Sequence, residues 1–348
     1  MDSTVKIKVD SGSRIPKYQQ IIHSIIKDIE NGSLKIGQKI PSINELSEDY
    51  YLSRDTVEKA YKRLKDQKII ISAKGKGYYI AKTDLISKTN ILLLLNKLSS
   101  YKMRVYNAFV GSLGPEAHVD LRIYHCDEKL FLNILEENVG GYDYYVIMSH
   151  FADKDLNHLS YTDASLKALN SIPSEKLILL DNDLPQLNSD YASVYQDFKQ
   201  EIYNALCEGI KKLRKYDKLM LVFPDKTHYP YPRGILHGFR NFCTEHNFDF
   251  EVLSEIYQDM ELHAKDAFII IEENDLVTLV KQVRDSDFKL GKDIGIISYN
   301  DTPLKDLLGI SCVSTDFDVM GETAAYMIRK NKREKVKNVF SFVDRDSI

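Results

Sequence analysis

The first regular pattern in the chain is an apolar stripe at helical spacing. It predicts a helix that begins near Lys17 and stops at Asn31-Gly32, where the glycine ends the periodic run. The stripe consists of Tyr18, Ile21, Ile22, Ile25, Ile26 and Ile29.

Two shorter helices and a hairpin follow this stripe. Ser42 with Glu45 three residues later is a capping-box pattern, so a second helix is expected to start there. Ser53 is a suitable N-cap for a third helix, whose expected inner face is Val57, Ala60, Tyr61 and Leu64. Apolar runs at 69–71 and 78–80 flank a turn with two glycines, which predicts a hairpin. Three helices and a hairpin are the layout of a winged helix-turn-helix.

Charge distinguishes this first segment from the rest of the chain. Residues 1–82 contain 16 Lys and Arg against 10 Asp and Glu, a net charge of +6. The whole chain carries −4, so the remaining residues carry −10. A basic module joined to an acidic one indicates separate partners, a polyanion for the first and a small or uncharged molecule for the second.

Periodicity and charge leave two interpretations of the first module open, DNA binding and protein interaction. For DNA binding, the third helix would enter the major groove with its N-terminus first, Arg54 reading guanine or gripping phosphate. Lys74 and Lys76 would reach phosphates or the minor groove from the hairpin tip. The candidate DNA-binding residues are Ser42, Asn44, Ser53, Arg54, Thr56, Lys59, Lys62, Lys74, Lys76 and Gly77.

Residues 16–81 resemble the winged helix of the GntR family along nearly their whole length. The resemblance is carried by Pro16-x-Tyr18-x-Gln20, Gly37-x-x-Ile40-Pro41-Ser42, Ser53-Arg54-x-Thr56-Val57 and Gly75-x-Gly77. It implies double-stranded operator DNA as a partner. The family often has arginine two residues after the Pro-Ser pair, where this chain has Asn44, so the bases that are read can differ.

The remainder of the chain alternates short apolar runs with helical stretches. Helices are expected at 199–214, 233–246 and 275–284, among others. Apolar strands separated by helices are typical of parallel sheets covered on both faces, and the length favours two α/β lobes. The expected strands are 91–95, 119–124, 144–148, 177–180, 219–223, 250–253, 268–271 and 294–298.

Polar side chains gather directly after these strands. In parallel sheets, ligands bind at the carboxyl ends of strands, although any one such residue can simply cap the next helix. Carboxylates and amides suit sugar hydroxyls, and Tyr101, Tyr195 or Tyr231 could stack on a sugar ring. The candidate ligand-binding residues are Asn96, Ser149, Asp181, Gln196, Arg233, Glu272 and Asn300.

The second part of the chain resembles the periplasmic-binding-protein-like effector domain of the lactose-repressor family. The likeness is carried by 294–303, Val313-Ser314-Thr315, 321–325, Arg345-Asp346-Ser347 and Gly238-Phe239. At two ligand positions of that family this chain has Asn300 in place of Asp and Ile235 in place of Arg, with Arg233 the nearest candidate. The implied domains are a winged helix at 1–82, a linker at 83–89 and a two-lobed effector domain at 90–348. Lobe one is expected at 90–196 and 315–334, and lobe two at 197–314 and 335–348.

Together these patterns predict a multidomain, ligand-responsive transcriptional regulator that acts as a homodimer. No phosphate-cradling loop, nucleophile motif or metal-ligand spacing is found, so we expect neither an enzyme nor a cofactor or metal. The longest apolar run, 91–95, is too short for a membrane span, and the four cysteines are expected to be free thiols, so the chain is expected in the cytoplasm. The effector is expected to be a monosaccharide, while a sugar-binding protein without this regulatory role and a regulator of a non-sugar ligand such as a nucleoside remain alternatives.

Overall fold

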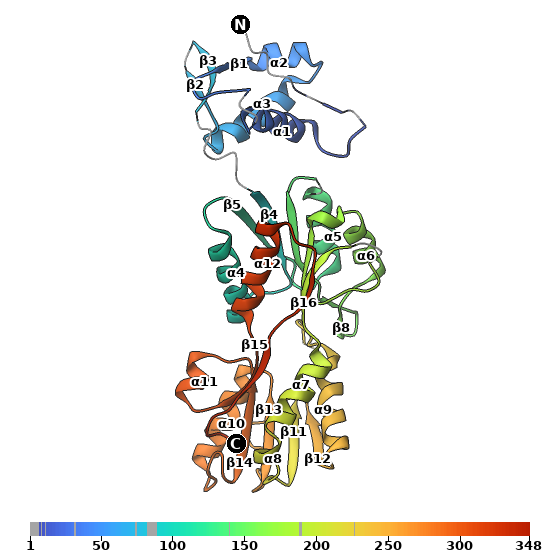
Figure 1. The fold of residues 1–348 in the computed structure, drawn as a ribbon, viewed down its shortest axis with the longest axis vertical. Helices are drawn as coiled ribbons and strands as arrows, with labels where there is room; N and C mark the ends of the chain where they lie inside the picture. Colours follow the sequence, from blue (N-terminus) through green and yellow to red (C-terminus); the bar gives the residue numbers. More distant parts are fainter. Residues whose placement is uncertain are drawn as a thin grey trace. The chain divides into compact units, whose positions relative to one another are not determined.

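The computed structural model describes residues 7, 9–10, 12–30, 33–73, 75–81, 89–138, 140–187, 190–225 and 227–348. The chain divides into two compact units, one comprising Met1–Thr89 with Pro115–His118 and the other Asn90–Gly114 with Val119–Ile348 (Figure 1). The main division falls between Thr89 and Asn90. Of the linker expected at 83–89, only Thr89 lies within the described residues.

The first unit contains the expected helices and hairpin. The helices are α1 (Lys17–Glu30), α2 (Ile43–Asp49) and α3 (Arg54–Asp66). The strands β1 (Lys39–Ile40), β2 (Ile70–Ala73) and β3 (Gly77–Ile80) form an antiparallel sheet in the order β1-β3-β2. The two-residue strand β1 was not predicted, because it is too short to show an alternating pattern.

Side-chain caps set the starts of α2 and α3, as predicted. The Ser42 hydroxyl accepts from the Glu45 backbone N–H at 3.2 Å, and the Glu45 carboxylate accepts from the Ser42 N–H at 2.6 Å. The Ser53 hydroxyl accepts from the Thr56 N–H at 3.3 Å. The inner face of α3, formed by Val57, Ala60, Tyr61 and Leu64, is buried in one apolar core with the stripe on α1.

The second unit consists of two lobes, each built on a six-stranded sheet. The sheet of lobe one has the order β16 (Lys335–Lys337), β10 (Ala192–Tyr195), β9 (Leu177–Asp181), β6 (Tyr144–Met148), β4 (Thr89–Leu95), β5 (Ala117–Ile123). The sheet of lobe two has the order β12 (Asp249–Leu253), β11 (Lys218–Val222), β13 (Asp266–Ile270), β14 (Ile294–Tyr299), β15 (Ser311–Thr315), β17 (Phe340–Val343). Strand pairs from β16 to β4 and from β12 to β15 are parallel, and β17 is antiparallel to β15. The predicted parallel sheets are confirmed.

Helices accompany both sheets. Lobe one has α4 (Ser100–Leu113), α5 (Glu128–Asn138), α6 (Asp163–Asn170) and α12 (Phe317–Lys330), with a short hairpin of β7 (Phe151–Ala152) and β8 (His158–Leu159) and a 3₁₀ turn, η1 (Ser174–Lys176). Lobe two has α7 (Phe198–Glu208), α8 (Ile210–Leu213), α9 (Arg233–Glu245), α10 (Glu273–Asp285) and α11 (Pro303–Leu307). The single helix expected at 199–214 is therefore two, divided at Gly209, which caps α7.

Glycines allow two helix pairs to pack closely. A Cβ atom at Gly321 of α12 would lie 2.4 Å from the backbone oxygen of Val105 in α4, and Figure 1 shows these two helices side by side. A Cβ atom at Gly238 of α9 would lie 2.1 Å from the backbone oxygen of Lys199 in α7. Both distances are shorter than van der Waals contact allows. Each pair of helices can therefore pack this closely only because the glycine has no side chain.

The chain crosses between the lobes three times, after β10, after β15 and after β16. The crossings are bonded to one another: the Asn338 N–H donates to the Tyr195 oxygen at 2.8 Å, and the Asp316 N–H donates to the Val339 oxygen at 2.9 Å. The Asn338 side-chain amide also donates to the Asp316 oxygen at 2.9 Å. The third crossing comes later in the chain than expected, because Lys335–Lys337 pairs with β10 in lobe one. The expectation that residues 335–337 belong to lobe two is therefore wrong. A short polar edge strand has no apolar pattern by which the sequence could show it.

Candidate ligand cavity and DNA-binding surface

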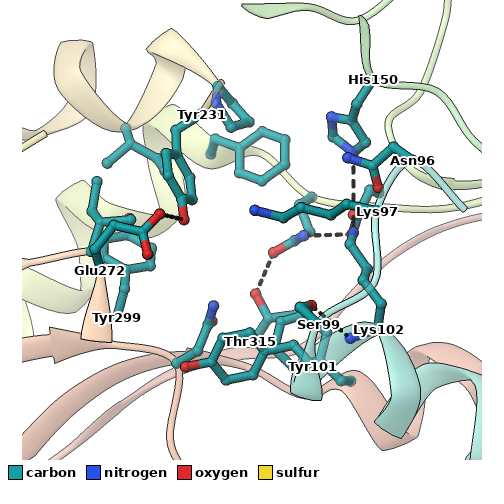
Figure 2. A pocket seen from close by; sticks show the side chains of 18 of the residues that line it. Asn96, Lys97, Ser99, Tyr101, Lys102, His150, Tyr231, Glu272, Tyr299 and Thr315 are labelled. Carbon is teal, nitrogen blue, oxygen red and sulfur yellow. Dashed lines mark hydrogen bonds and ion pairs between the residues drawn. The ribbon is translucent and has the colours of Figure 1, made fainter. Parts of the chain in front are cut away.

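A cavity of about 410 Å³ lies between the two lobes (Figure 2). It is lined by residues that follow β4, β10, β13 and β14, by the last residues of β9 and β15, and by the first turns of α4 and α10. The carboxyl ends of parallel strands meet here from both lobes, which is where an α/β fold exposes polar groups to a ligand. A site of this size falls in the range of small-molecule pockets.

Five of the seven residues predicted to bind ligand line this cavity, namely Asn96, Asp181, Gln196, Glu272 and Asn300. Ser149 does not: it is buried, and its hydroxyl donates to the Ser160 backbone oxygen at 2.5 Å. Arg233 does not either, because its guanidinium donates to the Asn157 side-chain oxygen. Of the three tyrosines predicted to stack on a ligand, Tyr101 and Tyr231 line the cavity and Tyr195 does not.

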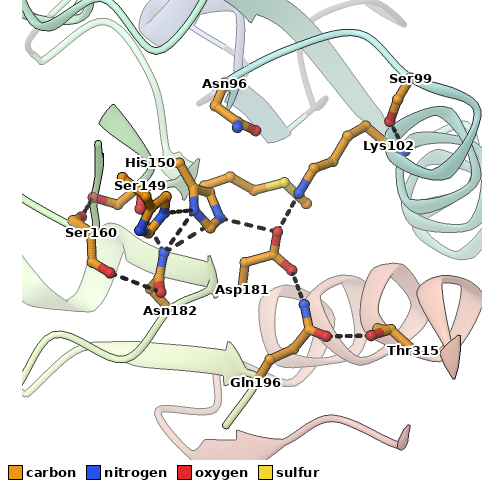
Figure 3. A network of polar contacts seen from close by, with 12 residues as sticks. Asn96, Ser99, Lys102, Ser149, His150, Ser160, Asp181, Asn182, Gln196 and Thr315 are labelled. Atoms are coloured by element: carbon orange, nitrogen blue, oxygen red, sulfur yellow. Dashed lines mark hydrogen bonds and ion pairs between the residues drawn. The ribbon is translucent and has the colours of Figure 1, made fainter. Parts of the chain in front are cut away.

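Asp181 is the centre of a buried polar network in lobe one (Figure 3). One carboxylate oxygen accepts from the Gln196 side chain at 2.7 Å, and the other accepts from Lys102 and, at 3.2 Å, from His150. Burial alone would raise the pKa of Asp181, but the Lys102 charge and the His150 hydrogen bond together lower it below its ordinary value. Asp181 is therefore ionised and already paired, and it contributes no uncompensated charge to the cavity.

Two histidines support this network from behind. His150 Nδ1 lies 2.8 Å from His158 Nε2, and burial lowers the pKa of both rings, that of His158 to about 3. Both rings are therefore neutral near pH 7. With His150 donating from Nε2 to Asp181, its Nδ1 must accept the proton of His158 Nε2, which sets the tautomers of both rings.

The wall from lobe two carries two carboxylates. The Tyr231 hydroxyl donates to Glu272 at 2.5 Å, and the Tyr101 hydroxyl donates to Glu273 at 3.1 Å. Tyr101 belongs to α4 of lobe one, so its bond with Glu273 joins the two lobes beside the cavity. Its ring also stacks on Phe317, with centroids 5.4 Å apart.

A buried lysine in α11 holds the end of β14. The Lys305 ammonium donates to the backbone oxygens of Tyr299 at 2.7 Å and Asn300 at 2.8 Å, and to the Tyr101 hydroxyl at 3.3 Å. Burial lowers the pKa of Lys305. Asn300 has a left-handed backbone with φ of 63°, and these bonds stabilise that turn.

Three lysines at this site were not predicted. Lys102 and Lys305 lie within helices whose patterns gave no sign of a buried charge. Lys97 directly follows Asn96 at the end of β4 and lines the cavity, so the strand-end rule could have found it. Its ammonium lies 4.8 Å from the ring centre of Tyr231 and 5.5 Å from that of Tyr229.

The predicted DNA-binding residues of the first unit lie on α2, α3 and the hairpin. Arg54 and Lys62 are exposed on α3, and Asn44 is exposed on α2. Lys59 is exposed too, and its ammonium lies 4.2 Å from the ring centre of Tyr18. These positions leave positive groups along one helix for a polyanion, as the sequence predicted, and their contact with DNA stays a prediction.

The hydroxyls of this surface already have partners within the unit. Ser42 and Ser53 cap α2 and α3, and the Ser53 and Thr56 hydroxyls are 2.6 Å apart. On the hairpin, Lys76 is exposed and Gly77 has φ of 106°, a conformation that favours glycine. Lys74, which was predicted to bind DNA, lies outside the described residues.

Within the described ranges, no helix is long and apolar enough to cross a membrane. In the same residues, no group of three or more His, Cys, Asp or Glu side chains is placed to hold a metal ion.

Two family models match the chain. That of the bacterial regulatory proteins of the gntR family matches residues 17–80, and that of the periplasmic binding protein-like domain matches residues 212–348. The chain is 40% identical over 83 residues, 23% of its length, to the HTH-type transcriptional repressor YtrA of Bacillus subtilis (strain 168). The match spans 64% of that repressor, so the chain covers less than two thirds of this relative.

Solved structures show the same fold for the second unit. A LacI family transcriptional regulator from Lactobacillus casei, with bound glucose, matches 74% of this chain and 99% of its own with a TM-score of 0.58 at 14% identity. The lac repressor dimer, bound to operator and the anti-inducer ONPF, matches 75% of this chain and 94% of its own with a TM-score of 0.56 at 13% identity.

These matches define the class of protein as one with an N-terminal helix-turn-helix domain followed by a two-lobed α/β domain with parallel sheets. Residues 17–80 thus match the gntR family model and the second unit has the fold of LacI-type regulators, so both resemblances predicted from the sequence are confirmed.

Proposed function

We propose that this protein is a sequence-specific DNA-binding transcriptional regulator whose affinity for operator DNA is controlled by a small ligand, a sugar, bound between the lobes. The observation that carries the proposal is the polar cavity between the lobes, to which both lobes contribute amides, carboxylates and tyrosine rings. Such groups form bidentate hydrogen bonds with vicinal hydroxyls and stack on the apolar face of a sugar ring. The LacI family regulator that shares this fold was solved with glucose bound.

For DNA, we propose that α3 enters the major groove with Arg54 at its leading end. Lys76 at the hairpin tip would add a phosphate contact, and Lys62 another along the helix. One such module contacts too few base pairs for specificity, so the regulator would act in the cytoplasm as a homodimer on a two-fold symmetric operator. The lac repressor with the same effector fold was solved as a dimer on its operator.

Coupling between the two functions would pass through the crossings between the lobes. Gln196 lines the cavity, donates to Asp181, and accepts from Thr315 at the second crossing. A ligand that bonds Gln196 in the closed cleft would shift the angle between the lobes, and so the spacing of the paired DNA-binding units. A coupling free energy of about 1–3 kcal/mol changes operator affinity by about 5- to 150-fold.

The DNA half of the proposal is tested with Arg54→Ala. Loss of a base or phosphate contact should weaken operator binding by about tenfold or more without changing the melting temperature. Arg240→Ala is the matched control, because Arg240 is exposed on α9 of lobe two. A salt titration should show affinity falling steeply as phosphate contacts are screened. Unchanged binding in Arg54→Ala would contradict the assigned orientation of α3.

The ligand half is tested by screening the full chain for thermal stabilisation by monosaccharides and nucleosides, since a ligand that binds the native state raises its melting temperature. Asn300→Gly retains the left-handed turn and removes the side chain. A sugar that stabilises the protein and loses this effect in Asn300→Gly supports the proposal. Stabilisation by a nucleoside alone would favour a regulator of a non-sugar ligand, and sugar binding without operator binding would favour a sugar-binding protein.

A further inference from the structure

The two walls of the cavity carry opposite charges. Lobe one contributes Lys97 and, behind it, the Lys102–Asp181 pair, while lobe two contributes Glu272 and Glu273. The pair in lobe one is neutral overall, so Lys97 provides the charge of that wall. A ligand in this cavity therefore meets a cation on one side and carboxylates on the other.

Among the three lysines at this site, Lys97 is the one whose ammonium has neither an ion pair nor a hydrogen bond with the described residues. Lys102 is paired with Asp181, and Lys305 uses its ammonium on two backbone oxygens and a hydroxyl. Within the part of the chain that the structure describes, Lys97 takes part in no ion pair. Figure 2 shows its side chain extending into the open centre of the cavity, with the amine near the ring of Tyr231.

Such a cation is costly to keep without a counter-ion. Burial and the neighbouring Lys102 charge lower the pKa of Lys97, so its surroundings disfavour the ammonium form despite the opposing effect of Glu272. The faces of Tyr229 and Tyr231 stabilise the charge in part. An anion that accepts a hydrogen bond from the ammonium would compensate the charge more completely than the two rings do.

The residue before Lys97, Asn96, has a buried side-chain oxygen without a hydrogen-bond donor in the described part of the chain. Asn96 is 6% exposed, and its side-chain oxygen has no hydrogen-bond partner among the described residues. A buried carbonyl oxygen without a donor is destabilising, and a rotation of the amide toward the cavity that Asn96 lines would let a ligand hydroxyl satisfy it. The same wall thus offers a place for one anionic group and one hydroxyl side by side.

We propose that the effector is an acidic sugar, whose carboxylate or phosphate binds Lys97 and whose hydroxyls bind Asn96, Gln196 and Glu272. This inference rests on the proposed function, namely that the cavity binds a sugar. The carboxylates of lobe two orient the ligand, because they repel its acidic group and accept its hydroxyls. A neutral sugar would leave the Lys97 charge without a counter-ion in the closed cleft.

The test uses the full chain and compares neutral sugars with acidic sugars that have the same ring and differ in the group at C6. Glucose and galactose are titrated beside their uronates and their 6-phosphates, with binding measured by calorimetry and the change in operator affinity as the second readout. At least one acidic sugar is expected to bind about tenfold or more tightly than its neutral parent. Lys97→Met should remove that advantage, while Lys97→Arg, which retains the charge, should preserve most of it.

Lys129→Met is the matched control, because Lys129 is exposed on α5 of the same lobe. Binding of a uronate but not a phosphate identifies a carboxylate ligand, and the reverse identifies a phosphate. Equal or tighter binding of a neutral sugar, unchanged by Lys97→Met, would overturn this inference and leave the proposed function intact. If no sugar of either kind binds the protein or changes its operator affinity, both proposals fail in their sugar part. The Arg54→Ala test of DNA binding is unaffected by that outcome.

Discussion

The Lys305 ammonium lies 2.8 Å from the backbone oxygen of Asn300, so a buried charge holds the turn that carries a cavity-lining residue. We predict that Lys305→Met lowers the free energy of unfolding of the effector domain by about 2 kcal/mol, because two buried carbonyl groups lose their donor. Chemical denaturation of the full chain measures the change. Lys212→Met is the control, since its ion pair with Asp344 is exposed and should contribute less than about 1 kcal/mol. Equal losses in the two variants would mean that the bonds of Lys305 add nothing particular.

The packing of α4 on α12 gives a paired prediction from two glycines. Gly321→Ala should destabilise the effector domain by about 1–3 kcal/mol, because its Cβ atom would meet backbone atoms of α4 at 2.4 and 2.8 Å. Gly111→Ala, on α4, should instead stabilise the domain by about 0.5–1 kcal/mol, because a Cβ atom there meets nothing within 4 Å. Calorimetric melting of both variants decides the matter, and a stabilised Gly321→Ala variant would contradict the close contact.

The hydrogen-bonded pair of His150 and His158 predicts that the protein loses stability in acid. The pKa of His158 is lowered to about 3 in the folded protein, so between about pH 6.5 and pH 3 the unfolded state binds more protons. The contribution of His158 to the free energy of unfolding is fully present above about pH 6.5. It is lost as the pH falls toward 3, by on the order of 1 kcal/mol per pH unit. His158→Gln should make the free energy of unfolding less dependent on pH between pH 6 and pH 4. Parallel pH profiles for the wild type and the variant would show that His158 is not neutral in the fold.

Tyr51 predicts a gain in stability. It lies in the turn between α2 and α3, has φ of 50°, and its side chain is 95% exposed. Tyr51→Gly should raise the melting temperature of the first unit, because a left-handed residue with a Cβ atom costs about 1 kcal/mol and the exposed ring contributes little packing. Tyr51→Ala retains that cost and should show no gain. Operator affinity measured on both variants would also reveal whether the exposed ring contacts DNA.

Sequence reasoning predicted those parts of the fold that have strong local patterns. The apolar runs at 91–95, 177–180 and 294–298 became central strands, and the Ser42 and Glu45 pair became a capping box. It failed where elements are short and polar, as in β16, whose place is set by pairing with β10 rather than by its own residues. Edge strands need little burial, so their sequences carry little periodicity.

The same reasoning predicted the region of the cavity better than its chemistry. Strand ends identified Asn96, Asp181, Gln196, Glu272 and Asn300 as residues that meet in space. Position after a strand does not tell which way a side chain turns, and Ser149 bonds Ser160 instead of facing the cavity. Arg233 was predicted from its closeness to the family's ligand position at Ile235, and its guanidinium bonds Asn157 instead. Nor does it show the lysines that helices bring to the site, because a charge in a helix is usually on the solvent side.

The three bonded crossings between the lobes constrain how the effector domain can move. Hydrogen bonds at Tyr195, Asp316 and Asn338 join the three segments into a single hinge. A twist or shift of one segment alone would break its bonds to the others. The remaining easy motion is a rotation that opens or narrows the cleft. If the proposed ligand binds here, whatever its chemistry, its effect on the rest of the molecule would depend on one quantity, the angle between the lobes. Ligands of different shape would then differ in how far they change this angle. They would differ in the size of the change in operator affinity rather than in its kind.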